Sequence, residues 1–296
     1  MTRASAPGTT LPFTKGHGTR NDFVLLLDED GDIDLTPEVV RFLADRRGGL
    51  GGDGVIRAVR SGNLPAGSAA EPDSWFMDYW NADGSTSEMC GNGARVFGAF
   101  LERETGADLS GGLDFMTRGG ARRVTSAGDG TYAIGMGGYT VGTGDAPFDA
   151  EVQARGLDMA RPALSVDVGN PHHVVALASL DELEALDLTV APDVMPVPAD
   201  GSNVEFVVAL GERAVNAEAR GLVRMRVHER GSGETQSCGT GACAVALAVK
   251  TWAGADAPAV WDVEVPGGVV TVRIFEDHTV LEGPAVLVAE GVVTLP

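Results

Sequence analysis

The chain has 296 residues, of which 44% are hydrophobic and 22% charged, a composition typical of a globular protein with enough length for two domains. Its net charge of −20 and its lack of any basic run argue against nucleic acids and anionic membranes as partners. Because no apolar run could span a bilayer and residues 1–18 lack a secretory hydrophobic segment, we expect a cytoplasmic protein with a frayed N-terminal arm.

In the first half of the chain, the periodicity of apolar residues predicts strands alternating with helices. A helix over residues 37–47 begins at Pro37, a residue suited to the first helical position. Residues 90–106 predict a second helix that is apolar on nearly every face, which is typical of a helix inside a core. The predicted strands cover residues 22–28, 54–59 and 74–80, followed by short strands between 113 and 136.

The second half repeats this plan. A helix over residues 179–188 has Ser179 as its expected N-cap, and residues 238–254 predict another helix with an almost continuous apolar surface. Residues 61–74 and 192–201 are rich in turn-forming residues, so we expect surface loops there. The predicted strands cover residues 170–177, 203–210, 222–229, 260–265, 269–275 and 279–283.

Matching residues recur at a nearly constant spacing, which indicates an internal duplication. Two pairs lie 148 residues apart and two more lie 149 residues apart. Because the repeated residues belong to loops and strand ends, we expect the duplication to bring equivalent loops to a common place. The pairs are Asn21 and Asn170, Gly54 and Asn203, Asn81 and Glu229, and Cys90 and Cys238.

The motifs CGNGA, starting at Cys90, and CGTGA, starting at Cys238, each place a cysteine at a predicted helix N-terminus. Unpaired backbone N–H groups and the positive end of the helix dipole stabilise a thiolate there, so we expect both thiol pKa values to fall below about 8.5. The flanking glycines leave these N–H groups uncovered, so they can also bind a carboxylate. The third cysteine, Cys243, falls inside the apolar helix and is expected to pack in the core.

Two cysteines at two pseudo-symmetric helix N-termini suit the inversion of a carbon stereocentre. One cysteine, as a thiolate, removes a proton from one face of the carbon, and the other, as a thiol, delivers a proton to the opposite face. This reaction requires no metal and no organic cofactor. The chain has only two lysines, Lys15 and Lys250, and neither lies in a persuasive site for the Schiff base of pyridoxal phosphate.

Three other interpretations compete with this one. A redox or binding protein would use Cys90 and Cys238 as a reversible disulfide. A proline-type racemase would use a similar cysteine pair, but its substrate would leave many of the surrounding polar residues unpaired. Residues 49–54, GLGGDG, match a dinucleotide-binding pattern, yet they follow a helix and open a strand, which is the reverse of that fold.

As a set, the motifs resemble the diaminopimelate epimerase family. KGHGTRNDFVLL, GLGGDGV, NADGSTSEMCGNGAR, GNPHHV, GSNVEFV and VHERGSGETQSCGTGAC occur in the family's order along nearly the whole chain. The resemblance implies a cofactor-independent isomerase that interconverts L,L- and meso-2,6-diaminopimelate in bacterial lysine and peptidoglycan precursor biosynthesis. We expect a homodimer that binds this amino acid.

The resemblance and the two apolar helices imply an α/β (α+β) fold with two pseudo-symmetric domains, each a curved, mainly antiparallel sheet wrapped around a central buried helix. We expect the N-terminal domain to cover residues 1–140 and to be completed by a last strand within residues 285–296. The C-terminal domain is expected to cover residues 141–284. The family also implies that the domains close on the substrate and exclude water.

By the same resemblance, Cys90 and Cys238 are the catalytic acid–base groups, with His172 beside Cys90 and Glu229 beside Cys238. Arg230 suits the distal carboxylate of the substrate. The implied substrate-binding residues are Asn21, Asn81, Gly91, Asn92, Asn170, Asn203, Glu229, Arg230, Gly239 and Thr240, and no metal ligand is implied.

The chain departs from the family pattern at a few positions. Gly54 stands where many members have glutamine, which removes one side-chain contact with the substrate. Arg20 precedes Asn21 where glycine is usual, and His173 follows His172 where a small residue is common. These departures concern the finer substrate contacts and leave both cysteines in place.

Overall fold

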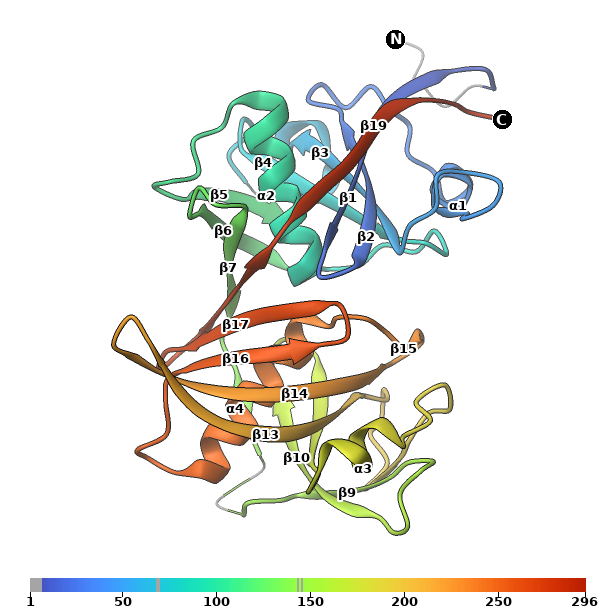
Figure 1. The fold of residues 1–296 in the computed structure, drawn as a ribbon. Helices are drawn as coiled ribbons and strands as arrows, with labels where there is room; N and C mark the ends of the chain where they lie inside the picture. The colour runs from blue at the N-terminus through green and yellow to red at the C-terminus, as the bar shows by residue number, and fades with distance from the viewer. Residues whose placement is uncertain (1–6, 68–69, 143, 145) are drawn as a thin grey trace. The chain divides into compact units, whose positions relative to one another are not determined.

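The computed structural model describes residues 7–67, 70–142, 144 and 146–296 (Figure 1). The chain divides into two compact units, Met1–Ile134 with Gly283–Pro296, and Gly135–Glu282. The C-terminal strand therefore belongs to the first unit, although it follows the second in sequence. No helix among the described residues combines the length and the apolar composition that crossing a bilayer requires.

The first unit is mostly β-sheet. Helix α1 (Pro37–Ala44) has Thr36 as its N-cap, whose Oγ1 accepts a hydrogen bond from Val39 N at 3.4 Å. Helix α2 (Gly91–Thr105) ends before Gly106, whose φ of 68° favours glycine. The other elements are β1 (Thr10–Gly18), β2 (Asn21–Leu27), β3 (Gly54–Arg60), 3₁₀ turns η1 (Ser61–Asn63) and η2 (Pro65–Gly67), β4 (Trp75–Asn81), β5 (Leu113–Thr117), β6 (Gly120–Ser126), β7 (Thr131–Gly137) and β19 (Val286–Thr294).

The second unit has the same character. Helix α3 (Leu180–Glu184) is short and begins after Ser179, the predicted N-cap, whose Oγ accepts a hydrogen bond from Glu182 N at 3.2 Å. Helix α4 (Gly239–Ala253) is as long as α2. The strands are β8 (Thr140–Val141), β9 (Ala150–Gln153), β10 (Arg161–Asp167), β11 (Pro171–Ala176), β12 (Asp193–Met195), β13 (Asn203–Val215), β14 (Glu218–Glu229), β15 (Gly233–Glu234), β16 (Val260–Val265), β17 (Gly268–Ile274) and β18 (Thr279–Pro284).

The two units pair their strands in the same way. In the first unit, β2 and β3 are parallel, β3 and β4 antiparallel, β4 and β5 parallel, and β5 and β6 antiparallel. In the second, β11, β13, β14, β16 and β17 repeat that series in the same order. Even the register repeats, because Phe23 pairs with Gly54 and, 149 residues later, His172 pairs with Asn203. The predicted two-fold repeat of a mainly antiparallel α/β fold is confirmed.

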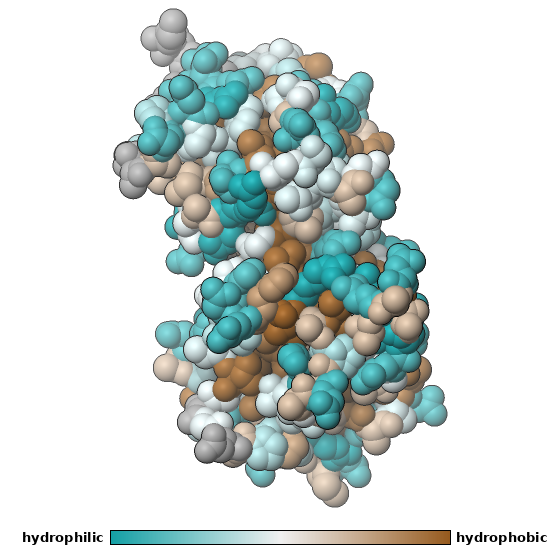
Figure 2. All heavy atoms as spheres, turned by 90° about the vertical axis from the view of Figure 1, so that its left-hand side faces the viewer, coloured by the Kyte–Doolittle hydropathy of each residue, from teal (hydrophilic) through white to brown (hydrophobic). Residues whose placement is uncertain are grey.

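The long helices form the core of their units. Every residue of α2 from Gly91 to Leu101 is buried, and α4 is buried without interruption from Gly241 to Val249. Figure 1 shows each helix beside the strands of its own unit. Burial of each large apolar side chain contributes about 1.5–3 kcal/mol, so these helices are central to the stability of both sheets. On the face shown in Figure 2, hydrophilic residues cover much of the surface, as the net charge predicts.

Several predicted elements differ from the structure. A frayed arm was predicted for residues 1–18. Residues 1–6 lie outside the described residues, and the prediction is wrong for 10–18, which form β1 between β2 and β19. Helix α3 ends at Glu184, so the predicted helix over 179–188 is too long. The predicted loop over 192–201 contains β12, which pairs with β9. The errors at β1 and β12 concern segments that pair with distant strands, β19 and β9, and local sequence patterns do not report such pairing.

Candidate active site

Cys90 is the N-cap residue of α2. Its Sγ accepts a hydrogen bond from Gly93 N at 3.4 Å and lies 3.6 Å from Asn21 Oδ1, to which the thiol donates. Asn92 Nδ2 donates to the same oxygen at 3.3 Å. The first unit therefore brings together three predicted site residues at the positive end of the α2 dipole. Asn81, a fourth, instead donates to Ser85 Oγ at 3.0 Å.

The side chain of Asn21 is oriented by a residue that the sequence interpretation missed. Asn21 Nδ2 donates to Asp53 Oδ2 at 2.8 Å, and Arg46 Nη2 donates to the other oxygen, Asp53 Oδ1, at 2.7 Å. A carboxylate only accepts hydrogen bonds, so it holds the amide nitrogen of Asn21 and leaves the amide oxygen toward Cys90. The available signal was the aspartate of GLGGDGV, a segment that belongs to the family motifs although it was assigned no contact of its own.

We expect Asp53→Ala to lower kcat/KM by about 10- to 100-fold, because Asn21 would no longer be held in one orientation beside Cys90. The stability of the fold should change little, since the Arg46–Asp53 ion pair is 58% and 43% exposed. Steady-state kinetics and thermal unfolding measure the two effects. Asp114→Ala, which removes another exposed aspartate–arginine pair, is the control. Equal kinetics for both variants would contradict the orienting role.

Cys238 is the N-cap residue of α4 and repeats the arrangement of Cys90. Its Sγ accepts a hydrogen bond from Gly241 N at 3.3 Å and lies 3.5 Å from Thr240 Oγ1. Its side chain is more deeply buried than that of Cys90, with only 6% of the residue exposed. Each of the two core helices therefore begins at a cysteine whose sulfur caps the first turn.

The first turn of each helix requires glycine. A Cβ on Gly241 would lie 3.2 Å from Cys238 Sγ and 2.7 Å from Glu205 Oε1, and a Cβ on Gly93 would lie 3.0 Å from Met77 Cε. The residues at the N-termini of α2 and α4 are the predicted Gly91, Asn92, Gly239 and Thr240. Backbone N–H groups in a first turn have no partner within the helix, so they suit an anion such as a carboxylate.

The carboxyl group of Glu229 lies beside Cys238, as predicted. It accepts a hydrogen bond from Thr235 Oγ1 and forms another with the Cys238 thiol. Burial raises the pKa of Glu229, and the nearby carboxylate of Glu205 raises it further. Thr235 is a second residue that the sequence interpretation missed, although it lies within the quoted ERGSGETQSC segment.

The expectation that both thiol pKa values are lowered is wrong for Cys238. Burial raises the pKa of its thiol well above the usual value, and the charges of Glu229 and Glu205 raise it further. The hydrogen bonds from Thr240 and Gly241 act in the opposite direction but do not compensate. Desolvation therefore outweighs the helix N-terminus, and Cys238 is held as a thiol that can donate a proton.

His172 lies at the start of β11 and is completely buried. Its Nδ1 is 2.7 Å from Glu205 Oε1 and its Nε2 is 3.1 Å from Asn170 Oδ1, so both ring nitrogens have partners. The structure thus brings His172 and Asn170 together with Glu205, which the sequence interpretation had not assigned. His172 was also expected to lie beside Cys90. The two residues belong to different units, and this expectation stays a prediction.

The remaining predicted residues lie at the start of β13 and the end of β14. Asn203 Oδ1 accepts a hydrogen bond from Arg230 N at 2.8 Å, and Arg230 Nη1 donates to Asp200 O at 2.6 Å. Arg230 is an exposed residue. At Gly54, a Cβ would lie 2.5 Å from Trp80 O, so a glutamine there would require the local backbone to shift.

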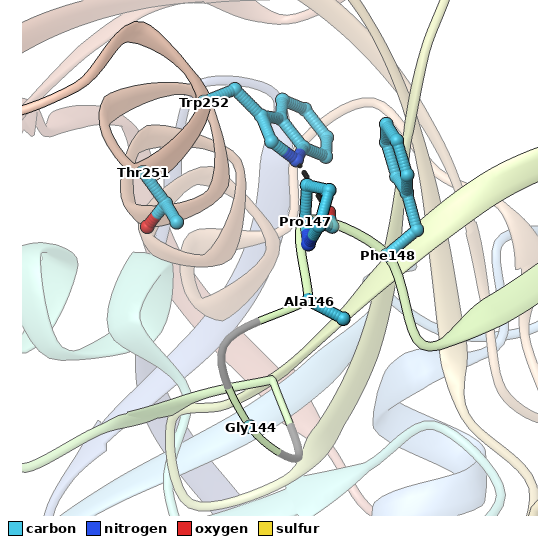
Figure 3. Close-up of a pocket in the computed structure, with 6 residues that line it drawn as sticks. All are labelled: Gly144, Ala146, Pro147, Phe148, Thr251 and Trp252. Carbon is cyan, nitrogen blue, oxygen red and sulfur yellow. Dashed lines mark hydrogen bonds between the residues drawn. The ribbon is translucent and has the colours of Figure 1, made fainter.

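Metal ligands, the third cysteine and a surface pocket complete the description of the structure. Among the described residues, no group of three or more His, Cys, Asp or Glu side chains could hold a metal ion. Cys243 is fully buried in α4, as predicted. A pocket of about 560 Å³ lies at the C-terminal end of α4, where Trp252 Nε1 donates to Pro147 O at 2.8 Å (Figure 3). None of the predicted site residues lines it.

The comparison with protein families decides between the competing interpretations. The family model described as diaminopimelate epimerase matches residues 13–142 and 164–288. The chain belongs to the diaminopimelate epimerase family. The diaminopimelate epimerase of Streptomyces coelicolor is 47% identical, covering 96% of this chain and 95% of the relative, and that of Mycobacterium avium is 45% identical, covering 95% and 96%. The predicted family and the predicted isomerase class are confirmed.

Solved structures confirm the fold. A PhzF-family phenazine biosynthesis protein of Bacillus anthracis superposes with a TM-score of 0.65 at 16% identity, covering 96% of this chain and 99% of that protein. A hydroxyproline epimerase of Agrobacterium vitis superposes with a TM-score of 0.60 at 14% identity, covering 97% and 91%. At such low identity these similarities concern the architecture and not the substrate.

Proposed function

We propose that this enzyme interconverts L,L- and meso-2,6-diaminopimelate by a two-base mechanism in which Cys90 and Cys238 transfer the protons. The observation that carries the proposal is the repeated cap, in which the sulfur of each cysteine accepts a hydrogen bond from the third residue of a buried helix. A structural cysteine would not need this position twice, whereas an epimerase needs one proton-transfer group for each face of the carbon.

In the proposed reaction, the thiolate of one cysteine takes the α-proton and becomes a thiol. The electron pair of the broken C–H bond passes into the substrate carboxylate, giving an enediolate-like intermediate. The other cysteine then gives its thiol proton to the opposite face of the same carbon and becomes a thiolate, so the overall charge is unchanged. The positive ends of the α2 and α4 dipoles stabilise the growing negative charge on the carboxylate.

The two cysteines are not equivalent in this scheme. Because the pKa of Cys238 is raised by burial and by the nearby carboxylates, Cys238 suits the role of proton donor when the substrate first binds. Glu229, hydrogen-bonded to that thiol, exchanges the proton with it when the reaction runs in the other direction. His172 is proposed to assist Cys90 through Nε2, which would exchange its contact with Asn170 for the thiol.

The polar side chains support diaminopimelate over a smaller amino acid. Beyond the hydrogen bonds described above, Asn170, Asn203 and Arg230 carry further amide or guanidinium N–H groups, more than a single amino-acid group would use. Polar groups left unpaired by a smaller substrate would weaken its binding. Asn81 completes the proposed set. The second amino-acid group of diaminopimelate, with its carboxylate on Arg230, accounts for this surplus.

We also propose that the enzyme is a cytoplasmic homodimer that works without a cofactor. Support for a homodimer comes from β19, where Val286, Val288 and Val292 are 43%, 55% and 66% exposed. Exposed apolar residues concentrated on one strand are typical of a subunit interface. Light scattering should therefore give about twice the chain mass of 30.6 kDa. A monomer at all concentrations would contradict this part of the proposal.

Solvent exchange provides the direct test of the function. In heavy water, with reduced enzyme and no pyridoxal phosphate, the α-hydrogen of L,L-diaminopimelate should be replaced by deuterium while the meso isomer forms. Proton NMR follows the exchange, and proline in a parallel sample should not exchange. Absence of exchange with fully reduced enzyme would refute the function, and exchange of proline alone would favour a proline-type racemase.

A further inference from the structure

We infer that Glu205 is a positioning residue for His172, holding the imidazole in one orientation with its Nδ1–H bound to the carboxylate. The inference rests on the proposed function, because it concerns how a group of that site is prepared for proton transfer. Glu205 acts through His172 and is not itself proposed to touch the substrate.

The register of the sheet places the two side chains together. Strands β11 and β13 are parallel neighbours, and His172 pairs with Asn203 while Val174 pairs with Glu205. Side chains two residues apart on a strand point to the same face, so Glu205 lies on the face of Asn203 and diagonally across from His172. Glu205 Oε1 is 2.7 Å from His172 Nδ1, and both residues are completely buried.

The internal repeat shows that the fold does not require this pair. The positions equivalent to His172 and Glu205, 149 residues earlier, are Phe23 and Ile56, and they occupy the same register in β2 and β3. Both are fully buried apolar residues. A buried ionisable pair generally stabilises a fold no better than apolar residues of similar volume. The second unit therefore carries a histidine and a glutamate where an apolar pair would serve the core equally well.

The remaining contacts of the pair explain how it acts. Asn170 Oδ1 lies 3.1 Å from His172 Nε2, so the contact of Glu205 with Nδ1 turns Nε2 toward Asn170, one of the proposed substrate-binding residues. The other oxygen of Glu205, Oε2, is buried and has no hydrogen-bond partner among the described residues. Among the described residues, His172 is therefore the side chain to which this carboxylate is hydrogen-bonded. Oε1 also lies so near Gly241, in the first turn of α4, that a Cβ there would be 2.7 Å from it.

Glu205 also sets the charge of the surrounding site. The titratable groups near it are His172 and His173 on β11, Glu229 on β14 and Cys238 at the start of α4. Its negative charge contributes to the raised pKa values of Cys238 and Glu229. Removing only the charge should therefore move the pH profile of kcat/KM to lower pH, since both groups would lose their protons more easily.

Two variants of similar volume separate the hydrogen bond from the charge. Glu205→Gln keeps an acceptor for Nδ1–H, so it should retain most of kcat while its pH profile moves to lower pH. Glu205→Leu resembles the apolar residue at position 56 and removes the acceptor, so kcat should fall by about 10- to 100-fold, as is typical when a residue orienting a functional histidine is lost. Glu264→Gln, which alters a partly exposed ion pair of the same unit, is the control.

A spectroscopic measurement tests the inference independently of turnover. Proton–nitrogen NMR of the histidine-labelled enzyme, assigned with a His172→Gln variant, should show a protonated Nδ1 in the wild type and in Glu205→Gln, and its loss in Glu205→Leu. A Leu variant that keeps the Nδ1 proton and has kcat within twofold of wild type would overturn the inference. If wild type did not epimerise diaminopimelate, the proposed function would fail, but the NMR result would still decide whether Glu205 orients His172.

Discussion

Replacing either Cys90 or Cys238 by alanine should reduce kcat for net epimerisation by about 10²- to 10⁴-fold, the range typical of losing a general acid or base. Each sulfur caps the first turn of a buried helix, at the positive end of the helix dipole, where a carboxylate is favoured. An inversion needs a proton-transfer group on each face, so neither thiol can substitute for the other. Chiral chromatography of the L,L and meso isomers measures the loss directly.

The third cysteine supplies the control for this experiment. Cys243 is fully buried in the interior of α4, with Ala242 and Ala244 as its sequence neighbours. Cys243→Ala should keep a near-normal kcat and lose at most modest stability, because one small buried group is removed. Full activity in Cys90→Ala would exclude the two-base mechanism. Similar losses in all three variants would point to general unfolding instead, which circular dichroism detects.

The largest effect on stability is expected at a buried ion pair of the first unit. Arg57 on β3 pairs in register with Asp78 on β4, and its Nε and Nη2 donate to Asp78 Oδ2 at 2.8 and 2.5 Å. Arg57 Nη1 also donates to Ile33 O at 2.6 Å, and the Asp78 side chain is completely buried. Arg57→Ala should lower the free energy of unfolding by about 3–5 kcal/mol, because it leaves a buried carboxylate with less compensation.

Urea denaturation followed by circular dichroism measures this loss. The m-value should stay the same, since a changed m-value would mean that the variant unfolds by a different transition. Arg123→Ala is the matched control, because it breaks an arginine–aspartate pair of the same unit whose side chains are 51% and 72% exposed. That variant should lose no more than about 1 kcal/mol. Equal losses in the two variants would show that burial does not decide the strength of these pairs.

Much of the fold follows from short-range patterns. The predicted helices over 90–106 and 238–254 correspond to α2 and α4, and β16 has its predicted bounds of 260–265. These elements have strong apolar periodicity, clear glycine boundaries or both, so local information suffices. By contrast, β1 and β12 are weakly patterned and owe their structure to β19 and β9, their partners far along the chain.

The candidate site divides in the same manner. The repeated phrase predicts Cys90 and Cys238 as site residues, because chemically distinctive residues at a regular spacing are visible without coordinates, and the family resemblance adds Glu229. Asp53 and Glu205 lie within the family motifs GLGGDGV and GSNVEFV, but nothing in those motifs shows which side chain each of them contacts. Asp53 lies 32 residues from Asn21, and Glu205 lies 33 residues from His172, so only the pairing of strands brings each to its partner.

By itself, then, the sequence determined the repeat, the two core helices and the cysteine at the start of each, since these depend on residue type and on spacing along the chain. The tertiary structure decided which ionisable side chains surround those cysteines and how deeply they are buried. That burial reverses the expectation for Cys238, whose pKa is raised because desolvation and two neighbouring carboxylates outweigh the helix N-terminus. Helix-end chemistry is local, whereas desolvation depends on everything that packs around the group.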